Sequence, residues 1–260
     1  METIYWLPYY KEIIRDLEID PGSDIFASNV LSDLLSKNHR IHDRNEVIME
    51  LERSLEGRDV YIFGAGPDLE IELDRLVEEK RSRGRWTGSS TGNDILIAAD
   101  GATSVLMSRS LIPQVIVTDL DGGVEDQLRC LSRGSVIVVH AHGDNIQALR
   151  DIVPRMFGSI LGTTQADPGE AGGLDNFGGF TDGDRAAFLA QHFMARSITL
   201  LGFNFSEMGP KIGDGGMRME SMDPEENEFK FKKLAWANLL LGLISNPQVQ
   251  LYSGDPIIRL

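Results

Sequence analysis

The chain has 260 residues, of which 42% are hydrophobic, 7% aromatic and 25% charged; this composition is typical of a globular protein and excludes a disordered or fibrous chain. Forty acidic and 25 basic side chains give a formal net charge of −15, so the average field repels polyanions and argues against a nucleic-acid partner. Cys130 is the only cysteine, which excludes a disulfide within the chain and argues against a cysteine-based zinc site.

Neither a secretion signal nor a membrane span is expected. Position 2 carries an acidic residue, and no apolar core of a signal peptide follows it. The longest apolar run, from Leu234 to Ile244, is too short to cross a bilayer. We therefore expect a cytoplasmic protein that has no membrane partner.

Residues 1–56 are expected to form a helical segment. Apolar side chains recur there at helical spacing in two stripes, which Pro21-Gly22 separates. A third helix is expected from Asn45 to Leu55, ending at Gly57. The simplest interpretation is that these helices pack against the segment that follows them. The two stripes are Trp6, Tyr9, Tyr10, Ile13, Ile14 and Leu17, and Ile25, Ala27, Val30, Leu31, Leu34 and Leu35.

From Arg58 onwards the pattern changes to short β-branched runs that alternate with longer amphipathic stretches, as in a parallel sheet with crossover helices. The runs are continuously apolar, as expected of strands covered on both faces. Residues 57–260 are therefore predicted to form an α/β domain, a three-layer sandwich with a mostly parallel sheet. The expected strands are 59–63, 94–98, 115–118, 136–139, 159–161 and 198–201, followed by a C-terminal helix from about Pro224 to Leu243 and a short segment, 249–252.

Glycines and polar residues follow the predicted strands, at the sheet edge where ligands bind in open α/β folds. The first of these loops is Gly64-Ala65-Gly66-Pro67. It is not a dinucleotide fingerprint, because Leu69 stands where a third glycine is needed, and the chain has no phosphate-binding glycine-lysine-serine or glycine-lysine-threonine triplet. We expect the backbone of Gly64 and Gly66 to contact a nucleotide; a tight strand-to-helix turn is the alternative.

Three aspartates end two of the strands. Asp119 and Asp121 are two residues apart, so in extended backbone their carboxylates project to the same side and can hold one hard cation. Asp100 ends another strand. If the two strands are neighbours, ~4.8 Å apart, all three carboxylates can converge on Mg²⁺. The alternatives are a simple turn at Asp121 and a helix cap at Asp100.

The next loops supply further candidates. His142 and Asn145 are expected at the edge of the pocket as hydrogen-bonding residues, whereas His140, inside its strand, is expected to be a core histidine. Asp144 is either a metal ligand or a helix cap. The 18 residues from Thr163 to Phe180 form a loop of a length that is usually functional or disordered in compact domains.

Charged residues near the helix that follows this loop can contact phosphate. Asp182 and Asp184 stand at the start of that helix and suit a metal-bound phosphate, unless they only cap it. Four lysines follow in the C-terminal region. One or two of them could reach a phosphate, although a solvated helix surface is the alternative for most. These are Lys211, Lys230, Lys232 and Lys233.

As a set, these motifs resemble the archaeal 6-hydroxymethyl-7,8-dihydropterin pyrophosphokinases of the MptE type. The segment from Ala99 to Asp121 also resembles the catalytic domain of thiamin pyrophosphokinase. One position departs from the family pattern, since Asp68 stands where we expect a serine, which weakens direct phosphate binding by that helix start. The matching segments are 64–67, 99–102, Pro113 with 117–122, 140–145, 162–165 and 176–185, with Trp6, Tyr9 and Lys233-Leu234 near the two ends.

The resemblance implies transfer of diphosphate from ATP to the hydroxymethyl group of a reduced pterin, with release of AMP, on the route to tetrahydromethanopterin or folate. Such transfer depends mainly on positioning and charge stabilisation, so carboxylates that hold Mg²⁺ against ATP are the central requirement. Asp100, Asp119 and Asp121 are therefore assigned as the catalytic metal ligands. Candidates for pterin or nucleotide contacts are His142, Asn145 and Gln165, and candidates for metal or phosphate contacts are Asp182 and Arg185.

The expected partners are the two small substrates, ATP and the reduced pterin, and assembly into a homo-oligomer is left open. Three other functions stay as alternatives. They are thiamin pyrophosphokinase, a nucleotide-sugar-dependent glycosyltransferase-like protein, and a nucleotide-binding module without catalysis.

Overall fold

The structure is a computed structural model that describes residues 3–86, 91–169, 173–207, 209, 211–219, 224–245 and 247–254. Within these residues, seven strands form one sheet in the order β5-β4-β3-β2-β1-β6-β9, and every neighbouring pair in it is parallel. The predicted α/β fold is confirmed. The strands are β1 (Asp59–Phe63), β2 (Ile95–Ala99), β3 (Val115–Thr118), β4 (Val136–Ala141), β5 (Ile160–Thr164), β6 (Ser197–Leu201) and β9 (Gln248–Leu251).

The predicted strands match the observed ones to within a few residues. The largest differences are at β4 and β5, which continue beyond their predicted ends. Thr163 and Thr164 therefore belong to a strand and not to the long loop, which begins at Gln165. Residues 170–172 of that loop lie outside the described residues. A short antiparallel hairpin, β7 (Lys211–Ile212) with β8 (Arg218–Met219), was not predicted.

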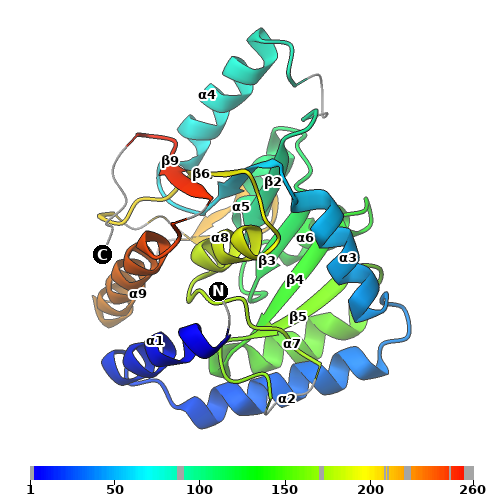
Figure 1. The fold of residues 1–260 in the computed structure, drawn as a ribbon, viewed down its shortest axis with the longest axis vertical. Coiled ribbons are helices and arrows are strands. Elements are labelled where there is room, and N and C mark those ends of the chain that lie inside the picture. The colour runs from blue at the N-terminus through cyan, green and yellow to red at the C-terminus, as the bar shows by residue number, and fades with distance from the viewer. Residues whose placement is uncertain are drawn as a thin grey trace.

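Helices cover both faces of the sheet (Figure 1). In the view of Figure 1, α1, α3, α8 and α9 lie on the viewer's side of the sheet, and α5 and α6 lie behind it. This arrangement gives the three predicted layers. The helices are α1 (Thr3–Asp16), α2 (Pro21–Lys37), α3 (Arg44–Leu55), α4 (Leu69–Ser82), α5 (Ala102–Ser108), α6 (Val124–Leu131), α7 (Ile146–Ile152), α8 (Asp182–His192) and α9 (Pro224–Gly242).

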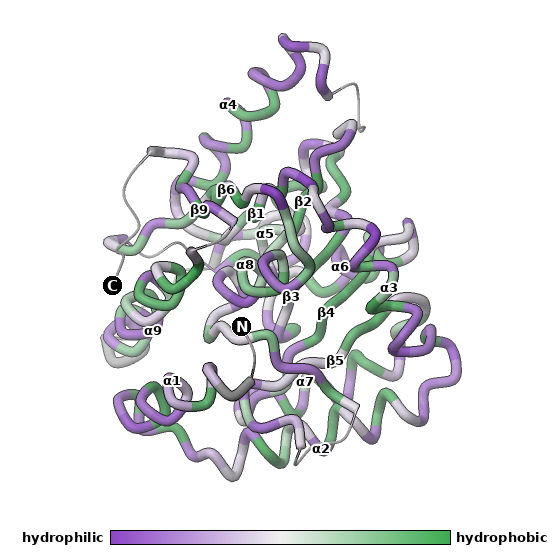
Figure 2. The backbone as a smooth tube through the Cα atoms, in the orientation of Figure 1, coloured by the Kyte–Doolittle hydropathy of each residue, from purple (hydrophilic) through white to green (hydrophobic). Residues whose placement is uncertain are grey.

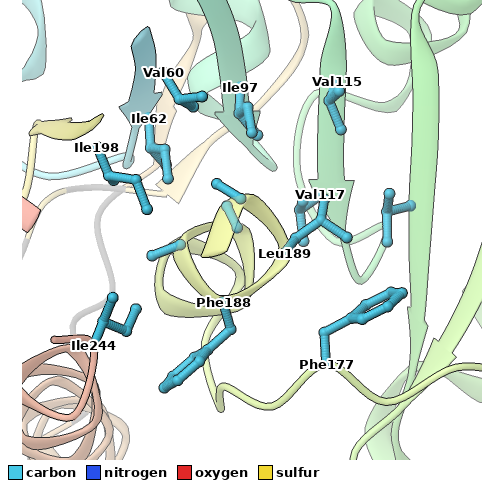
Figure 3. Close-up of a cluster of buried hydrophobic side chains, with 14 of the residues drawn as sticks. Val60, Ile62, Ile97, Val115, Val117, Phe177, Phe188, Leu189, Ile198 and Ile244 are labelled. Carbon is cyan, nitrogen blue, oxygen red and sulfur yellow. The ribbon is translucent and has the colours of Figure 1, made fainter. Parts of the chain in front are cut away.

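The core on the side of α8 holds the middle of the sheet (Figure 3). Val60 and Ile62 of β1 and Val117 of β3 point towards this helix. Leu189 of the helix is buried on the side that faces Val117, and Phe188 is buried on the side that faces away from the strands. Successive strand residues point to opposite faces, so the intervening positions build a second core on the far side, with α2, α6 and α7 at one end and α4 and α5 at the other. Figure 2 shows hydrophobic residues concentrated along the central strands.

The N-terminal helices share these two cores with the sheet. Trp6 and Ile13 of α1 and Val47 of α3 belong to the core on the side of α8, whereas Ala27 and Leu31 of α2 belong to the far one. The first predicted stripe thus belongs to the core on the side of α8 or packs against it. Four residues of the second stripe do the same for the far core, but Ile25 and Val30 do not. No helix in the described part of the chain combines the length and the apolar composition that a membrane crossing requires.

The strand order divides the loops at the carboxyl ends of the strands into two groups, those after β2 to β5 and those after β1 and β6. β2, β3, β4 and β5 follow one another on one side of β1, whereas β6 lies on its other side. The order of the strands therefore reverses between β1 and β6, and a crevice forms there in folds of this type. The loops after β2 and β3 are neighbours because these two strands pair.

Truncation of Phe188 to alanine is expected to lower the free energy of unfolding by about 3–5 kcal/mol, because it leaves a cavity in place of a fully buried side chain. Chemical denaturation measures this change. Ile71→Ala is the matched control, since Ile71 lies on α4 and is 57% exposed, and it should change stability by no more than about 0.5 kcal/mol. Equal losses in the two variants would contradict the packing described above.

Candidate active site

Three carboxylates meet where β2 and β3 end. Asp100 follows β2 directly, and Asp119 and Asp121 follow β3. One oxygen from each carboxylate lies within 4.8 Å of the other two. The neighbouring strands that this convergence needs are therefore present, and the three side chains form what we call the acidic triad.

The turns that carry the triad are strained. Asp100 has φ 43° and Leu120 has φ 68°, a backbone region that residues other than glycine rarely adopt and that costs on the order of 1–3 kcal/mol. The glycines beside them permit close packing. A Cβ on Gly122 would lie 2.2 Å from Asp100 Oδ2, and one on Gly101 would lie 2.4 Å from the carbonyl oxygen of Ile212. Gly122 is therefore needed for the two turns to approach each other, and Gly101 is needed for β7 to approach the turn that carries Asp100.

Hydrogen bonds fix the Asp100 carboxylate. Its Oδ1 accepts from Thr118 Oγ1 at 2.8 Å, from Gln127 Nε2 at 2.9 Å and from the Gly122 amide at 3.2 Å. Sequence reasoning missed both Thr118 and Gln127. Thr118 could have been found, since it is the last residue of the strand that leads to the triad, but nothing in the sequence marks Gln127, which lies on α6.

Asp119 is held by His142. The Nε2 atom of His142 lies 3.2 Å from Asp119 Oδ2, and the other ring nitrogen accepts a hydrogen bond from the Asp144 amide at 3.3 Å. Because Nδ1 accepts, the ring proton is assigned to Nε2, which donates to the carboxylate. Asp119 Oδ1 accepts from the Asp121 amide at 3.2 Å.

Asn145 occupies a different place from the one predicted. It was expected to contact a substrate at the pocket edge, but it is buried and its amide is used within the protein. Nδ2 donates to the carbonyl oxygens of Asp119 at 2.8 Å and His140 at 2.7 Å, and Oδ1 accepts from the His142 amide at 3.0 Å. Asn145 therefore ties the end of β4 to the triad turn and holds His142 in place.

The surroundings of Asp100 and Asp119 shift the pKa values of these two carboxyl groups in opposite directions. Burial, with the charges of Asp119 and Asp121, raises the pKa of Asp100 to about 8, although the hydrogen bond from Thr118 opposes the shift. Burial would also raise the pKa of Asp119. There the hydrogen bond from His142 and the charges of Lys233 and Arg185 outweigh it and hold the pKa well below its ordinary value.

This donor set fits a divalent cation. Three carboxylates that cannot all ionise cheaply in one place gain most from a positive charge between them. Their oxygens are hard ligands of the kind that Mg²⁺ prefers. Lys211 Nζ already lies 2.9 Å from Asp121 Oδ2, so the triad attracts cations from the neighbouring hairpin as well.

Two cavities meet at the triad. The first, of about 500 Å³, lies between the loops after β3, β4 and β5 and the connection from α1 to α2; we call it the N-terminal cavity. The second, of about 300 Å³, lies beside the loops after β1 and β6; we call it the glycine-turn cavity. Both volumes fall in the range of small-molecule sites. The residues that line both cavities are Asp121, Thr181, Asp182 and Lys233.

The remaining predicted site residues divide between these cavities. Gly64 and Gly66 line the glycine-turn cavity, although a Cβ on Gly66 would also lie 2.2 Å from the carbonyl oxygen of Gly202, so tight packing alone already requires that glycine. His142, Gln165 and Arg185 line the N-terminal cavity. His140 lines neither of the two; it is buried in β4, and burial lowers its pKa well below the ordinary value.

A buried polar chain runs along the wall of the N-terminal cavity. Gln165 Nε2 donates to Asp24 Oδ2 at 2.7 Å, and Gln165 Oε1 accepts from Arg185 Nη2 at 2.8 Å. Arg185 Nη1 in turn donates to Asp182 Oδ1 at 3.2 Å. Asp24 also accepts from the Tyr10 hydroxyl at 2.7 Å. Sequence reasoning missed Asp24, because it lies on α2, far along the chain from the strand ends.

The two acids predicted at the start of α8 have different roles. Asp184 caps the helix, since its carboxylate accepts from the backbone amides of Phe180 and Thr181 at 2.7 Å each. Asp182 instead faces the cavities. Burial and the charge of Asp119 raise its pKa well above the ordinary value, although Arg185 opposes the shift.

The sequence of the chain matches a known family over most of its length. The model of the family described as 6-hydroxymethylpterin diphosphokinase MptE-like matches residues 34–209, which include the triad and the loops after all strands from β1 to β6. The chain belongs to this family. The matched residues also include the site residues predicted between Gly64 and Arg185, but not the four C-terminal lysines that were considered as phosphate contacts.

Three archaeal relatives are similar over almost their whole length, and each is named 6-hydroxymethyl-7,8-dihydropterin pyrophosphokinase. The protein from Pyrococcus furiosus is 40% identical over 93% of this chain and 93% of its own. The protein from Methanocaldococcus jannaschii is 33% identical over 95% of this chain and 97% of its own. The protein from Methanothermobacter thermautotrophicus is 36% identical over 93% and 94%, respectively.

A solved structure of the MAf glycosyltransferase from Magnetospirillum magneticum AMB-1 is also similar. It has 18% sequence identity and a TM-score of 0.41, over 83% of this chain and 37% of that one. A likeness this distant carries no argument about activity, so the glycosyltransferase alternative gains no support from it.

The raised pKa of Asp100 predicts a pH-dependent response to Mg²⁺. Between about pH 4 and pH 8 the folded protein keeps a proton on Asp100 that the unfolded chain has released. This contribution to stability therefore falls as the pH rises. Because the proton must leave before a cation binds, Mg²⁺ should raise the melting temperature more at pH 8 than at pH 6.

Thermal unfolding of the wild type and of Asp100→Asn, with and without Mg²⁺, checks this expectation. The variant should show a small response that is the same at both pH values. An equal response of the wild type at pH 6 and pH 8 would contradict the role given to Asp100.

Proposed function

We propose that this chain is a Mg²⁺-dependent 6-hydroxymethyl-7,8-dihydropterin pyrophosphokinase, which transfers diphosphate from ATP to the reduced pterin and releases AMP. The observation that carries the proposal is the acidic triad, placed between two cavities in a chain of the MptE-like family. A reaction that joins two small substrates needs two neighbouring binding spaces and a means of stabilising phosphate charge between them. We also place this activity in the cytoplasm, on the route to tetrahydromethanopterin or folate.

In the proposed reaction the hydroxymethyl oxygen attacks the β-phosphorus of ATP. The bond between that phosphorus and the oxygen bridging to the α-phosphate breaks, and AMP leaves with the bridging oxygen. The hydroxyl proton is released, so the products are the pterin diphosphate, AMP and a proton. The β- and γ-phosphates move together, which distinguishes this transfer from that of an ordinary kinase.

Asp100, Asp119 and Asp121 are the residues that would hold Mg²⁺. When bound, the ion neutralises the charge of the polyphosphate and orients it. Hydrogen bonds from neighbouring side chains keep these carboxylates in one orientation. Gln127 donates to Asp100, and His142 donates to Asp119. Such supporting contacts commonly matter almost as much for metal affinity as the ligands themselves.

Cationic side chains complete the charge balance. Lys233 lines both cavities, Arg185 lines the N-terminal cavity and Lys211 the glycine-turn cavity. Arg185 is held by Asp182 and Gln165, so its guanidinium is preorganised. Fixed charges of this kind stabilise a developing negative charge without having to reorient during the reaction.

Incubation with ATP, Mg²⁺ and 6-hydroxymethyl-7,8-dihydropterin is expected to give AMP and the pterin diphosphate in equal amounts. Chromatography with mass detection identifies both products. Thiamin in place of the pterin should not be converted. Formation of ADP, or turnover with thiamin alone, would refute the proposal.

Asp119→Asn should lower kcat by at least about a hundredfold while the protein stays folded, because the variant loses one anionic ligand of the ion that stabilises the transferred group. Asp33→Asn is the matched control, since Asp33 is exposed on α2 and pairs with Lys37 within its helix. Circular dichroism confirms folding of both variants. Wild-type kcat in Asp119→Asn would exclude this residue from the metal site.

A further inference from the structure

We infer that the two substrates occupy separate cavities, with ATP in the glycine-turn cavity and the reduced pterin in the N-terminal cavity. This inference rests on the proposed function and adds to it which side of the triad each substrate takes. Three independent features support it: the charge of each cavity, its place in the sheet, and the polar groups on its wall.

The charges outside the triad differ between the cavities. Three lysines, Lys211, Lys230 and Lys233, line the glycine-turn cavity, and besides the shared Asp182 its only other acid among the lining residues is Glu207. The polyphosphate of ATP is strongly anionic and is attracted to such a group of cations.

The N-terminal cavity has the opposite balance. Its wall carries Glu18, Asp20, Asp24 and Asp144 in addition to the shared Asp182, against Arg185 and Lys233. A triphosphate would be repelled there, whereas an uncharged pterin ring is not. The charge distribution therefore separates an anionic donor from a neutral acceptor.

The topology of the sheet gives the same assignment. The glycine-turn cavity lies at the ends of β1 and β6, where the strand order reverses. Nucleotides bind in the crevice at this point in open α/β sheets. Gly64, Gly66 and Gly202 line this cavity, and Phe203 and Phe205 supply apolar surface for a base.

The N-terminal cavity has the groups that a pterin requires. A pterin is flat, and its pyrimidine edge presents N–H donors beside a carbonyl acceptor. Asp24 supplies acceptor oxygens and Arg185 supplies donors, and Gln165 bonds to both, which fixes their positions. The rings of Phe180 and Phe229 line the same cavity, and Lys233 Nζ lies 5.8 Å from the centre of each.

The acceptor and the donor would then meet at the shared wall. Asp121, Thr181, Asp182 and Lys233 line both cavities, so the pterin hydroxymethyl group approaches the triad from one side and the β-phosphate from the other. An attack from the side opposite the leaving AMP needs this arrangement, since entering and leaving oxygens lie roughly in line.

Adjacent residues of α9 provide a matched test. Phe229 lines only the N-terminal cavity, and Lys230 lines only the glycine-turn cavity. Phe229→Ala should raise KM for the pterin roughly tenfold, the equivalent of about 1.4 kcal/mol, and leave KM for ATP within about twofold. Lys230→Ala should raise KM for ATP roughly tenfold and leave KM for the pterin within about twofold. Lys232→Ala is the control, because Lys232 lines neither cavity and pairs with Glu228 on the surface.

Steady-state kinetics with each substrate varied in turn measures these effects, and titration of each substrate alone separates binding from turnover. The inference is overturned if Phe229→Ala raises KM for ATP and Lys230→Ala raises KM for the pterin, while the wild type still makes pterin diphosphate. It is also overturned if each variant raises both KM values equally. A wild type that forms no AMP with the pterin instead refutes the proposed function, and this inference with it. Melting temperatures of the variants that equal that of the wild type exclude misfolding as the cause of a change in KM.

Discussion

The mutual repulsion of three carboxylates at the ends of two paired strands is the constraint around which the site is built. The pairing of β2 with β3 forces Asp100 towards Asp119 and Asp121. Surrounding groups limit the cost: three donors bind one oxygen of Asp100, and His142 binds Asp119. The remaining excess of negative charge favours the binding of a cation between the three carboxylates. The proposed binding of a polyphosphate requires a cation at that place.

The sheet order converts this local arrangement into a site with two sides. The loops after β1 and β6 lie on one side of the triad, and the loops after β4 and β5 lie on the other. The helix α8 begins between them, and its first residue, Asp182, lines both cavities. The N-terminal helices add the outer wall of one cavity, so residues that come before the sheet in sequence take part in the site.

The features that the sequence predicts best depend on local pattern. The continuous β-branched runs predicted the central strands, and the acids at their ends predicted the triad, because parallel strands bring their carboxyl ends to one edge. Contacts that cross the chain could not be predicted in this way. Asp24 and Gln127 reach the site from helices, and the packing of those helices decides where the two side chains lie. Asn145 is polar, as a ligand-binding residue would be, but its side chain forms hydrogen bonds with the backbone instead.

The β7–β8 hairpin was missed for a related reason. Each of its strands has only two residues, too few to show a period. Its Lys211 nevertheless reaches Asp121. Long periodic elements can thus be read from a sequence, whereas short segments that rely on their neighbours cannot.

The left-handed backbone at Asp100 has an evolutionary consequence. Asparagine tolerates that conformation at least as well as aspartate and carries no charge to repel its neighbours. Selection for folding alone would therefore favour an amide at this position, and the acid persists only if catalysis is worth more than the lost stability. If Asp100 is a metal ligand as we propose, any redesign of this protein for heat resistance should leave it unchanged, because the replacement that folds best would remove a ligand of the ion.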